Sequence, residues 1–207
     1  MNNHLKKHNY FVCSYGGCGS KILTAYLKNF GNVFHIHSNN PPYELTRPGN
    51  SYIVEKNKYD EWFTEYLIPD NELNNYTVIY IYRNPVKAII SRFDNPVHLL
   101  HIQSNTSITI QDVINHQEDL YGIENFFDNY TIHKKKYNII CLKYEDLFDN
   151  IEKLNNILNL PNIPPLYPSK KETNKNTNIN IVKNLEKIYE NLINKMDKLS
   201  FIHINYT

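Results

Sequence analysis

The order of apolar and amphipathic segments constrains the fold of this 207-residue chain more than any other feature. Short apolar segments with the length of strands alternate with longer segments whose apolar residues recur at helical spacing. The predicted strands are residues 9–14, 33–37, 78–82 and 137–142, and the predicted helices are residues 20–30, 60–67, 85–93, 110–121, 123–133, 146–160 and 181–199. Strands that alternate with helices form parallel sheets covered on both faces. The order therefore predicts a three-layer α/β/α fold around a parallel sheet of about four to five strands, with a phosphate-binding turn like that of P-loop proteins.

Residues that begin or end helices accompany several of these segments. Gly31 follows the first predicted helix and is a suitable residue for its end. Pro85 lies in the first turn of the third predicted helix, where proline is tolerated. Residues 39–50 and 160–180 contain prolines among polar residues and are predicted loops. No internal repeat or second domain is apparent, so residues 1–207 are predicted to form a single domain.

Composition excludes several broad classes of function. The 22 Lys and Arg residues nearly balance the 21 Asp and Glu residues, and the net charge of +1 argues against a nucleic-acid coat or a polybasic membrane anchor. No apolar run approaches the roughly 18–20 residues of a membrane-spanning helix, and the polar N-terminus lacks a secretory apolar region. The three cysteines have no disulfide framework spacing, which predicts buried thiols in a reducing compartment. We therefore expect a cytoplasmic protein in which any anion site is local.

A glycine-rich turn separates the first predicted strand from the first predicted helix. The turn and the start of the helix comprise Tyr15, Gly16, Gly17, Cys18, Gly19, Ser20, Lys21 and Ile22. Such a turn directs backbone N–H groups and a helix N-terminus at an anion, and glycine lets the chain approach the ligand closely. Ser20 can cap the helix or donate to a phosphate oxygen, and Lys21 adds a positive charge. Two interpretations stay open at this point: a phosphate site and an ordinary glycine turn.

The turn does not match the Walker A pattern GxxxxGK[ST] of P-loop nucleotide triphosphatases. In one alignment Gly19 is the second glycine, and Ser20 then replaces the lysine. In the other alignment Lys21 is the lysine, and Ile22 then replaces the magnesium-binding hydroxyl. The third strand also ends at Arg83, where a Walker B strand would end in aspartate. A magnesium-dependent ATPase or kinase is therefore disfavoured.

The segment after the third strand combines an arginine with a serine eight residues later. The strand brings Arg83 to its carboxyl end, where open α/β sheets bind ligands, and Ser91 lies in the helix that follows. A guanidinium offers a planar fork of N–H groups to a phosphate, and a serine hydroxyl can donate to the same group. Arg92 either adds positive charge to this site or is only solvated. The pattern indicates a phosphate site formed by Arg83 and Ser91.

This segment resembles the 3′-phosphate motif of the sulfotransferase family that uses 3′-phosphoadenosine-5′-phosphosulfate (PAPS). In that family a strand is followed by Arg-Asn-Pro, five further residues and Ser, and Arg83, Asn84, Pro85 and Ser91 match these positions. The resemblance implies that Arg83 and Ser91 bind the 3′-phosphate that distinguishes PAPS from ATP. Together with two further landmarks, this resemblance spans roughly residues 10–150.

Two weaker landmarks of the same family occur in the same order. The turn SYGGCGSKIL is similar to the 5′-phosphosulfate loop, with Gly19 and Ser20 at its Gly-Thr/Ser positions. The segment KYEDLFDN resembles a later Tyr-Glu-Asp-Leu whose tyrosine touches adenine in cytosolic members, which implies this role for Tyr144. We interpret Glu145 and Asp146 as structural, with Asp146 as a helix N-cap. The resemblance implies PAPS, or its product 3′-phosphoadenosine-5′-phosphate (PAP), as the cofactor.

Two parts of the family pattern are missing. Many cytosolic members carry Pro-Lys-Ser-Gly-Thr, whose lysine stabilises the leaving phosphate, and alignment on Gly19 places Gly17 at that lysine. Lys21 or a basic side chain from elsewhere must then replace it. The family's C-terminal Arg-Lys-Gly-x-x-Gly segment is also absent. Lys170 and Lys171 lie in the loop where such a cofactor clamp belongs, and a solvated loop is an equally weighted interpretation.

The resemblance implies in-line transfer of a sulfuryl group to an acceptor hydroxyl or amine, with a 5′-phosphate as the leaving group. This reaction requires positioning, positive charge at the leaving phosphate and a base, and it requires no metal. The sequence has no HExxH or CxxC pattern, and no metal site is predicted. His37 is the first candidate for the base and His35 the second, because histidine titrates near neutral pH and both lie on one face of the second strand. Further candidates are Glu44, Glu55, His98 and His101.

The acceptor is predicted to lie against loops 39–57 and 94–108. Aromatic residues there and beside them, Phe93 included, suit a sugar, a phenol or a peptide tyrosine. We expect a small-molecule, glycan or peptide acceptor, no nucleic-acid or membrane partner, and a monomer or homodimer. The main hypothesis is a PAPS-dependent sulfotransferase. One alternative is a catalytically weakened PAP-binding module that keeps the fold, and a P-loop kinase or NTPase is a less favoured one.

Overall fold

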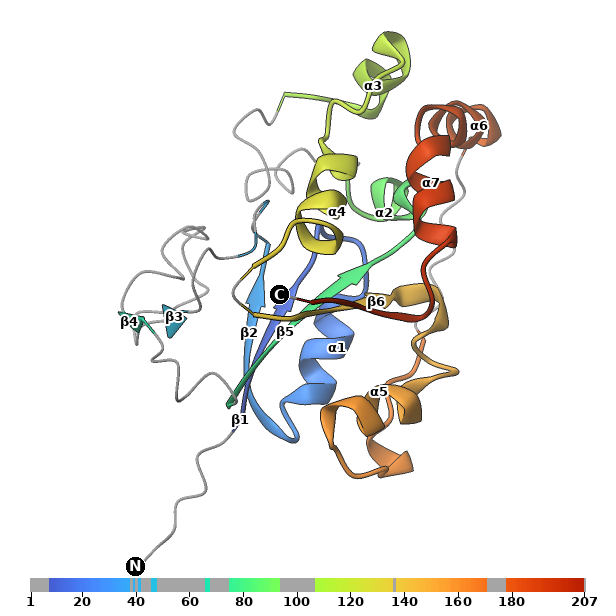
Figure 1. The fold of residues 1–207 in the computed structure, drawn as a ribbon. Coiled ribbons are helices and arrows are strands. Elements are labelled where there is room, and N and C mark those ends of the chain that lie inside the picture. Colours follow the sequence, from blue (N-terminus) through green and yellow to red (C-terminus); the bar gives the residue numbers. More distant parts are fainter. Residues whose placement is uncertain are drawn as a thin grey trace, which may run out of the picture.

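A five-stranded sheet forms the centre of the structure, a computed structural model (Figure 1). The structure describes residues 8–37, 39, 41, 75–93, 107–135, 137–170 and 178–206, and the backbone of residues 46–47 and 66–67. The strands lie in the spatial order β2 (Gly31–Ile36), β1 (His8–Cys13), β5 (Tyr76–Tyr82), β6 (Ile139–Lys143) and β7 (Ile202–Asn205). The first four strands are parallel, and β7 is antiparallel to β6. The predicted α/β fold with a mainly parallel sheet is confirmed.

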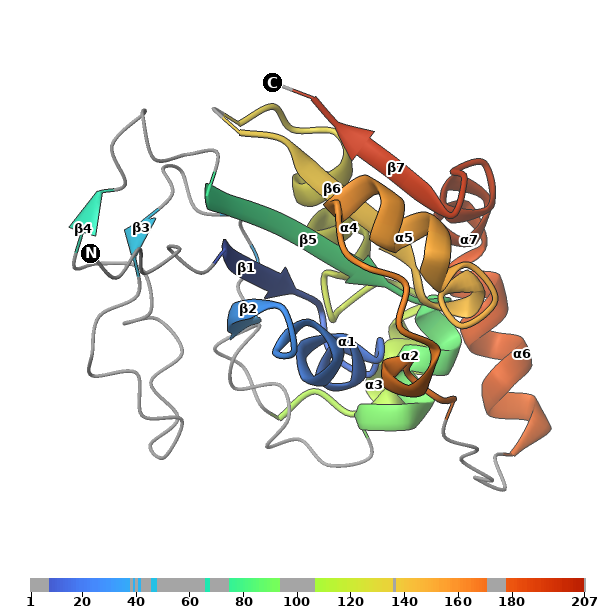
Figure 2. The same cartoon turned by 90° about the horizontal axis from the view of Figure 1, so that it is seen from below.

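Helices cover both faces of this sheet, as Figures 1 and 2 show. The strands alternate: Ile79 and Ile81 of β5 belong to one apolar cluster, whereas Tyr80 and Tyr82 belong to the other. The first cluster includes side chains of α1 (Ser20–Leu27) and α5 (Ile151–Leu158). The second includes side chains of α2 (Pro85–Arg92), α3 (Ile110–His116), α4 (Ile123–Thr131), α6 (Ile179–Ile188) and α7 (Glu190–Asp197). The three predicted layers are therefore present.

The strand order changes direction at β1. The chain passes from β1 through α1 to β2 on one side, and β5 later pairs with the other side of β1. Open α/β sheets bind ligands beyond the carboxyl ends of their strands at such a switch point. The glycine turn after β1 and Arg83 after β5 therefore lie at the same edge of the sheet on neighbouring strands.

Two predicted helix boundaries are wrong because the backbone turns earlier than the apolar period indicates. The first helix ends at Leu27, and Gly31 instead begins β2, where a Cβ would overlap the carbonyl group of His8. The helix predicted over residues 110–121 ends at His116, because Gln117 adopts a left-handed conformation with φ 55°. Apolar spacing identifies the buried face of a helix, but the terminal residues depend on local backbone conformation.

The helix predicted over residues 146–160 begins five residues later, at Ile151. Asp146 is not its N-cap, because it lies in the short 3₁₀ helix η5 (Tyr144–Asp146). Asn150 occupies the cap position, but its side chain donates to the carbonyl of Asp146 at 2.9 Å rather than capping the helix. A second 3₁₀ helix, η6 (Pro164–Leu166), lies in the predicted loop 160–180. The residues after β6 thus form a tight turn that holds Tyr144 next to the strand end.

The C-terminal amphipathic segment is two helices rather than one. Tyr189 separates α6 from α7, and its hydroxyl donates to the Asp119 carboxylate at 2.7 Å, which fixes the break. The strand β7 that follows has only four residues and was not predicted. Tyr66–Leu67, predicted as helix, form strand β4, which pairs with β3 (Thr46–Arg47) in a segment predicted as loop.

The structure tests two expectations from the composition, buried cysteine thiols and the lack of a membrane-spanning helix. Cys13, Cys18 and Cys141 are buried free thiols, as the sequence predicts. In the part of the chain that the structure describes, every helix is too short or too polar to cross a membrane.

A buried hydrogen bond fixes α1 relative to α5. The hydroxyl of Tyr26 in α1 donates to Oδ1 of Asn155 in α5 at 2.7 Å, and the amide nitrogen of Asn155 donates to Oδ1 of Asn162. Asn155 is fully buried, so its amide depends on these partners. Because α1 follows the glycine turn and α5 follows Tyr144, this bond holds together the two segments that carry these groups.

Tyr26→Phe is expected to lower the free energy of unfolding by about 1–2 kcal/mol, because it leaves the buried Asn155 oxygen without its donor. Denaturant unfolding measures this change. Tyr206→Phe is the matched control, since Tyr206 is 59% exposed and the substitution is expected to change stability very little. Equal effects of the two substitutions would contradict a stabilising role for this bond.

Candidate functional site

The turn after β1 depends on glycine at three positions. Gly16, Gly17 and Gly19 have φ values of 114°, 66° and 78°, in a region that residues with a Cβ rarely adopt. The carbonyl of Gly19 accepts the N–H groups of Ile22 and Leu23 at 2.9 and 3.2 Å, which begins α1. The turn therefore presents the start of α1 at the carboxyl edge of the sheet, which is the arrangement that favours an anion.

Cys18 supports the turn from within. Its thiol donates to the carbonyl oxygen of Gly16 at 3.0 Å, and its side chain is 2% exposed. Burial raises the pKa of the Cys18 thiol to about 12, although the nearby Arg83 lowers it in part. The thiol is therefore protonated at neutral pH and acts as a structural donor rather than a nucleophile.

Each glycine of the turn contacts a different neighbour at a distance that excludes a side chain. A Cβ at Gly17 would lie 2.6 Å from the backbone oxygen of Ala88 in α2. A Cβ at Gly16 would lie 2.7 Å from Cδ and Nε of Arg92, whose side chain thus crosses the turn. A Cβ at Gly19 would overlap the ring of Tyr144. The turn is therefore enclosed by α2 on one side and by Tyr144 on the other.

Arg83 joins the ends of three strands. Its Nη1 donates to the carbonyl oxygen of Gly17 at 3.1 Å, and its guanidinium carbon lies 4.9 Å from the centre of the Tyr144 ring. Its Nε is buried and has no hydrogen-bond partner among the described residues. A buried N–H of a guanidinium is costly without an acceptor, and an oxyanion would supply one.

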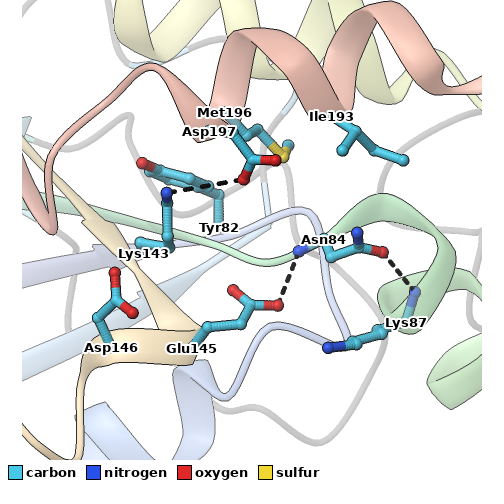
Figure 3. Close-up of a pocket in the computed structure, with 9 residues that line it drawn as sticks. All are labelled: Tyr82, Asn84, Lys87, Lys143, Glu145, Asp146, Ile193, Met196 and Asp197. Atoms are coloured by element: carbon cyan, nitrogen blue, oxygen red, sulfur yellow. Dashed lines mark hydrogen bonds and ion pairs between the residues drawn. The ribbon is translucent and has the colours of Figure 1, made fainter.

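Glu145, in the 3₁₀ helix after β6, holds the residue that follows Arg83. Its carboxylate accepts the backbone N–H of Asn84 at 3.1 Å, and the Asn84 side chain accepts the N–H of Lys87 at 3.2 Å to cap α2, as Figure 3 shows. The end of β5 is thus tied to the segment after β6. This agrees with the interpretation of Glu145 as a structural residue.

A cavity of about 270 Å³ lies beside these contacts (Figure 3). It is lined by Tyr82, Asn84, Lys87, Lys143, Glu145, Asp146, Ile193, Met196 and Asp197. Lys143 and Asp197 lie 3.9 Å apart, and the buried hydroxyl of Tyr82 has no hydrogen-bond partner among the described residues. Neither the glycine turn nor Arg83 lines this cavity, so it is separate from the surface that the turn offers to an anion.

A chain of hydrogen bonds links His35 of β2 and His37, just after β2, to the turn. Nδ1 of His37 lies 2.7 Å from the carbonyl oxygen of Ser14 and 3.2 Å from its hydroxyl. The Ser14 hydroxyl donates to the hydroxyl of Ser20 at 3.0 Å, and Ser20 lies 2.8 Å from Nε2 of His35. The two imidazole rings lie 4.4 Å apart, so both histidines share one face of the strand, as predicted.

The carbonyl of Ser14 sets the direction of this chain. A carbonyl oxygen only accepts, so Nδ1 of His37 carries a hydrogen and the basic lone pair of a neutral ring is on Nε2. Ser20 accepts from Ser14, and the proton of its own buried hydroxyl then goes to Nε2 of His35. Burial lowers the pKa of His35 to about 4, with smaller effects of Arg92, Lys21 and Lys28, so His35 is neutral and can accept.

The structure brings most of the predicted site residues together. Gly16, Gly17, Cys18, Gly19, Ser20, Arg83, Tyr144, His35 and His37 form one connected group. Lys21 is exposed and Ile22 half-buried in the first turn of α1, and Ser91 is half-buried in α2. Lys170 is exposed. Lys171, Glu44, Glu55, His98 and His101 lie outside the described residues, as do nearly all residues of the two predicted acceptor loops.

One predicted acceptor residue is misplaced, and two site residues were underrated or missed. Phe93 is 2% exposed and contacts the rings of Tyr15 and Tyr121 in the core, so it forms no acceptor wall.

Arg92 is not merely solvated, because its side chain covers Gly16. The sequence assigns no role to Ser14, which ends the first predicted strand and begins the segment SYGGCGSKIL. Its spacing of six residues from Ser20 carries no helical or strand signal that would have linked the two hydroxyls.

Comparisons with known proteins give one match. A family model described as "Sulfotransferase domain" matches residues 7–196. Searches of curated proteins and of solved structures found no match. Within the described residues, no cluster of three or more His, Cys, Asp and Glu side chains is arranged to hold a metal ion.

The contact between Gly19 and Tyr144 can be tested against a matched glycine. Gly19 and Gly122 both precede a helix with left-handed φ values of 78° and 68°, but a Cβ at Gly122 would meet nothing within 4 Å. Both alanine variants should lose about 1 kcal/mol to backbone strain. Gly19→Ala should lose about 1–3 kcal/mol more, because the methyl group displaces the Tyr144 ring.

Denaturant unfolding of the two single variants measures this difference. The double variant Gly19→Ala with Tyr144→Ala should lose less than the sum of its single effects, because the smaller side chain makes room for the methyl group. Equal losses in the two glycine variants, together with additive effects in the double variant, would contradict the contact.

Proposed function

The chain belongs to the sulfotransferase family, and we propose that it transfers a sulfuryl group from PAPS to a hydroxyl or amine of an acceptor. The acceptor class that we propose is a small molecule, a glycan or a peptide, and cytoplasm is the proposed location, as the buried free cysteines favour. The observation that carries the proposal is the environment of Arg83, whose buried Nε has no acceptor within the part of the chain that the structure describes and whose guanidinium already contacts the glycine turn.

We assign each part of PAPS to a group of residues at the carboxyl edge of the sheet. Arg83 and Ser91 bind the 3′-phosphate, and the Tyr144 ring lies against the adenine. The turn from Gly16 to Ser20 holds the 5′-phosphosulfate with its backbone N–H groups. Lys21, in the first turn of α1, provides positive charge as the 5′-phosphate leaves.

His37 is the proposed base. The carbonyl of Ser14 holds Nδ1–H, which orients the ring and leaves the basic position on Nε2. The base removes the proton of the acceptor as its oxygen or nitrogen attacks sulfur in line with the departing phosphate oxygen. The bond from sulfur to the phosphate oxygen breaks, and PAP leaves with the electron pair of that bond.

We expect PAP to raise the unfolding temperature more than ADP or Mg-ATP does at the same concentration, because only PAP carries the 3′-phosphate. Arg83→Ala should weaken PAP binding about 10- to 100-fold, because it removes charge-assisted hydrogen bonds of about 1.5–3 kcal/mol. Thermal shift and calorimetric titration measure both effects. Lys153→Ala, an exposed residue of α5, is the control. Equal stabilisation by Mg-ATP and PAP would refute the proposed donor.

One observation favours a second candidate function, a PAP-binding module with weakened catalysis. The position at which many family members have a lysine is Gly17, and the backbone oxygen of Ala88 excludes a side chain there. The positive charge at the leaving phosphate must then come from Lys21, Arg92 or another group. Binding of PAP without sulfation of any acceptor in panels of sugars, phenols and tyrosine peptides would favour this candidate.

His37→Asn separates binding from catalysis. The asparagine amide can still donate to the Ser14 carbonyl, but it offers no basic nitrogen in place of Nε2. We expect kcat to fall about 100- to 10,000-fold while the affinity for PAP changes little. Formation of PAP with an active acceptor measures kcat, and calorimetry measures the affinity. An unchanged kcat would exclude His37 as the base and direct attention to Glu44, Glu55, His98 and His101.

A further inference from the structure

The hydroxyl of Ser20 cannot serve both its present partner and a bound anion. It is 5% exposed and its single proton goes to Nε2 of His35 at 2.8 Å. The Ser14 hydroxyl donates to the Ser20 oxygen at 3.0 Å. An oxyanion in the turn can accept a hydrogen bond from Ser20 only if the proton leaves His35.

The loss of that proton changes what His35 must do. Once Ser20 donates to an anion, a lone pair of its oxygen faces the lone pair of Nε2, and the two repel each other. The repulsion disappears if Nε2 acquires a hydrogen and becomes the donor. A second proton makes the ring an imidazolium next to a bound anion, which stabilises that charge.

We propose that His35 takes up one proton from solvent when an oxyanion binds in the glycine turn, so that it holds the Ser20 hydroxyl toward the anion as a positioning residue. Nε2–H of the imidazolium then donates to Ser20, and Ser20 donates to the anion. The inference rests on the proposed function for the identity of the anion, the 5′-phosphate end of PAPS or PAP. Protonated His35 would also give the turn a positive charge, which the turn lacks because Gly17 stands where many family members have a lysine.

The burial of His35 and the positive charges around it explain why the proton arrives only with the anion. The positive charges of Arg92 in α2, of Lys21 in α1 and of Lys28 just after α1 act on the ring, and the His37 ring, just after β2, lies 4.4 Å from it. Burial is the main reason why the pKa of free His35 is about 4, and these cations lower the pKa further. A bound dianion stabilises the positively charged form of the ring, so the pKa of His35 rises on binding.

The sign of the pH dependence follows from this rise. The affinity for the anion is highest below a pH of about 4, where free His35 is already protonated. The affinity falls as the pH rises above about 4, and the contribution of His35 protonation is lost once the pH exceeds the higher pKa of His35 in the complex. Between the two pKa values the dissociation constant should increase by up to about tenfold per pH unit. A neutral tautomer change at His35 would instead give no pH dependence.

The experiment measures the affinity for PAP and for inorganic sulfate between pH 4.5 and 8 by calorimetry. Sulfate keeps its charge over this pH range. The phosphates of PAP titrate in this range, so for PAP the quantity compared is the difference in affinity between the wild type and a variant, in which the effect of phosphate titration cancels. His35→Gln keeps an amide that can donate to or accept from Ser20 but does not titrate. His116→Gln is the control, because His116 is exposed on α3 and bonds the carbonyl of Asp112 in its own helix.

The proposal expects a sulfate affinity that weakens with rising pH in the wild type and in His116→Gln, and a flat profile in His35→Gln. NMR titration of the His35 ring in the wild type needs no variant and should show a higher pKa with sulfate than without it. Equal slopes in the wild type and His35→Gln, or an unchanged His35 pKa with saturating sulfate, would overturn it. Failure of PAP to bind would refute the proposed function, while the sulfate measurements would still decide the role of His35.

Discussion

The contact of Arg83 with the glycine turn is the interaction on which the rest of the site depends. One guanidinium hydrogen-bonds the carbonyl of Gly17 after β1, follows β5 directly and lies over the Tyr144 ring after β6. Three strand ends therefore meet at one charged group. Because its Nε is buried without an acceptor among the described residues, the same group that connects the strands also retains capacity to bind an anion.

The glycines of the turn make this arrangement possible by close approach. Each of Gly16, Gly17 and Gly19 lies where a Cβ would collide with a side chain or with backbone, so the turn takes its shape from the surrounding elements as well as from its own sequence. The consequence at Gly17 is chemical, because no lysine can stand there. Positive charge near the turn comes instead from α1 and α2, through Lys21 and Arg92.

The hydrogen bonds among the serines and histidines run in one direction. The carbonyl of Ser14 fixes the proton on His37, and each hydroxyl along the chain then donates toward His35. The two histidines thus differ although they share a strand face: one holds a proton on Nδ1, and the other accepts a hydrogen bond on Nε2. This difference distinguishes a proposed base from a proposed positioning residue.

The sequence by itself determined the features that depend on local period and spacing. It predicted the parallel strands and their turns, the position of Arg83 at a strand end, and the shared face of His35 and His37, because strand and helix periods are properties of neighbouring residues. It did not predict the break at Tyr189, the four-residue antiparallel β7 or the early end of the helix before Gln117. These depend on a distant hydrogen bond, on a strand too short to signal itself and on a left-handed residue.

Only the tertiary structure decided which of these features meet. The strand order places β1 between β2 and β5, and so brings Ser20 to His35 and Gly17 to Arg83, residues 15 and 66 positions apart. It also laid Arg92 across Gly16, where the sequence left its role open. Such contacts result from the packing of whole strands and helices, which apolar spacing along the chain does not encode.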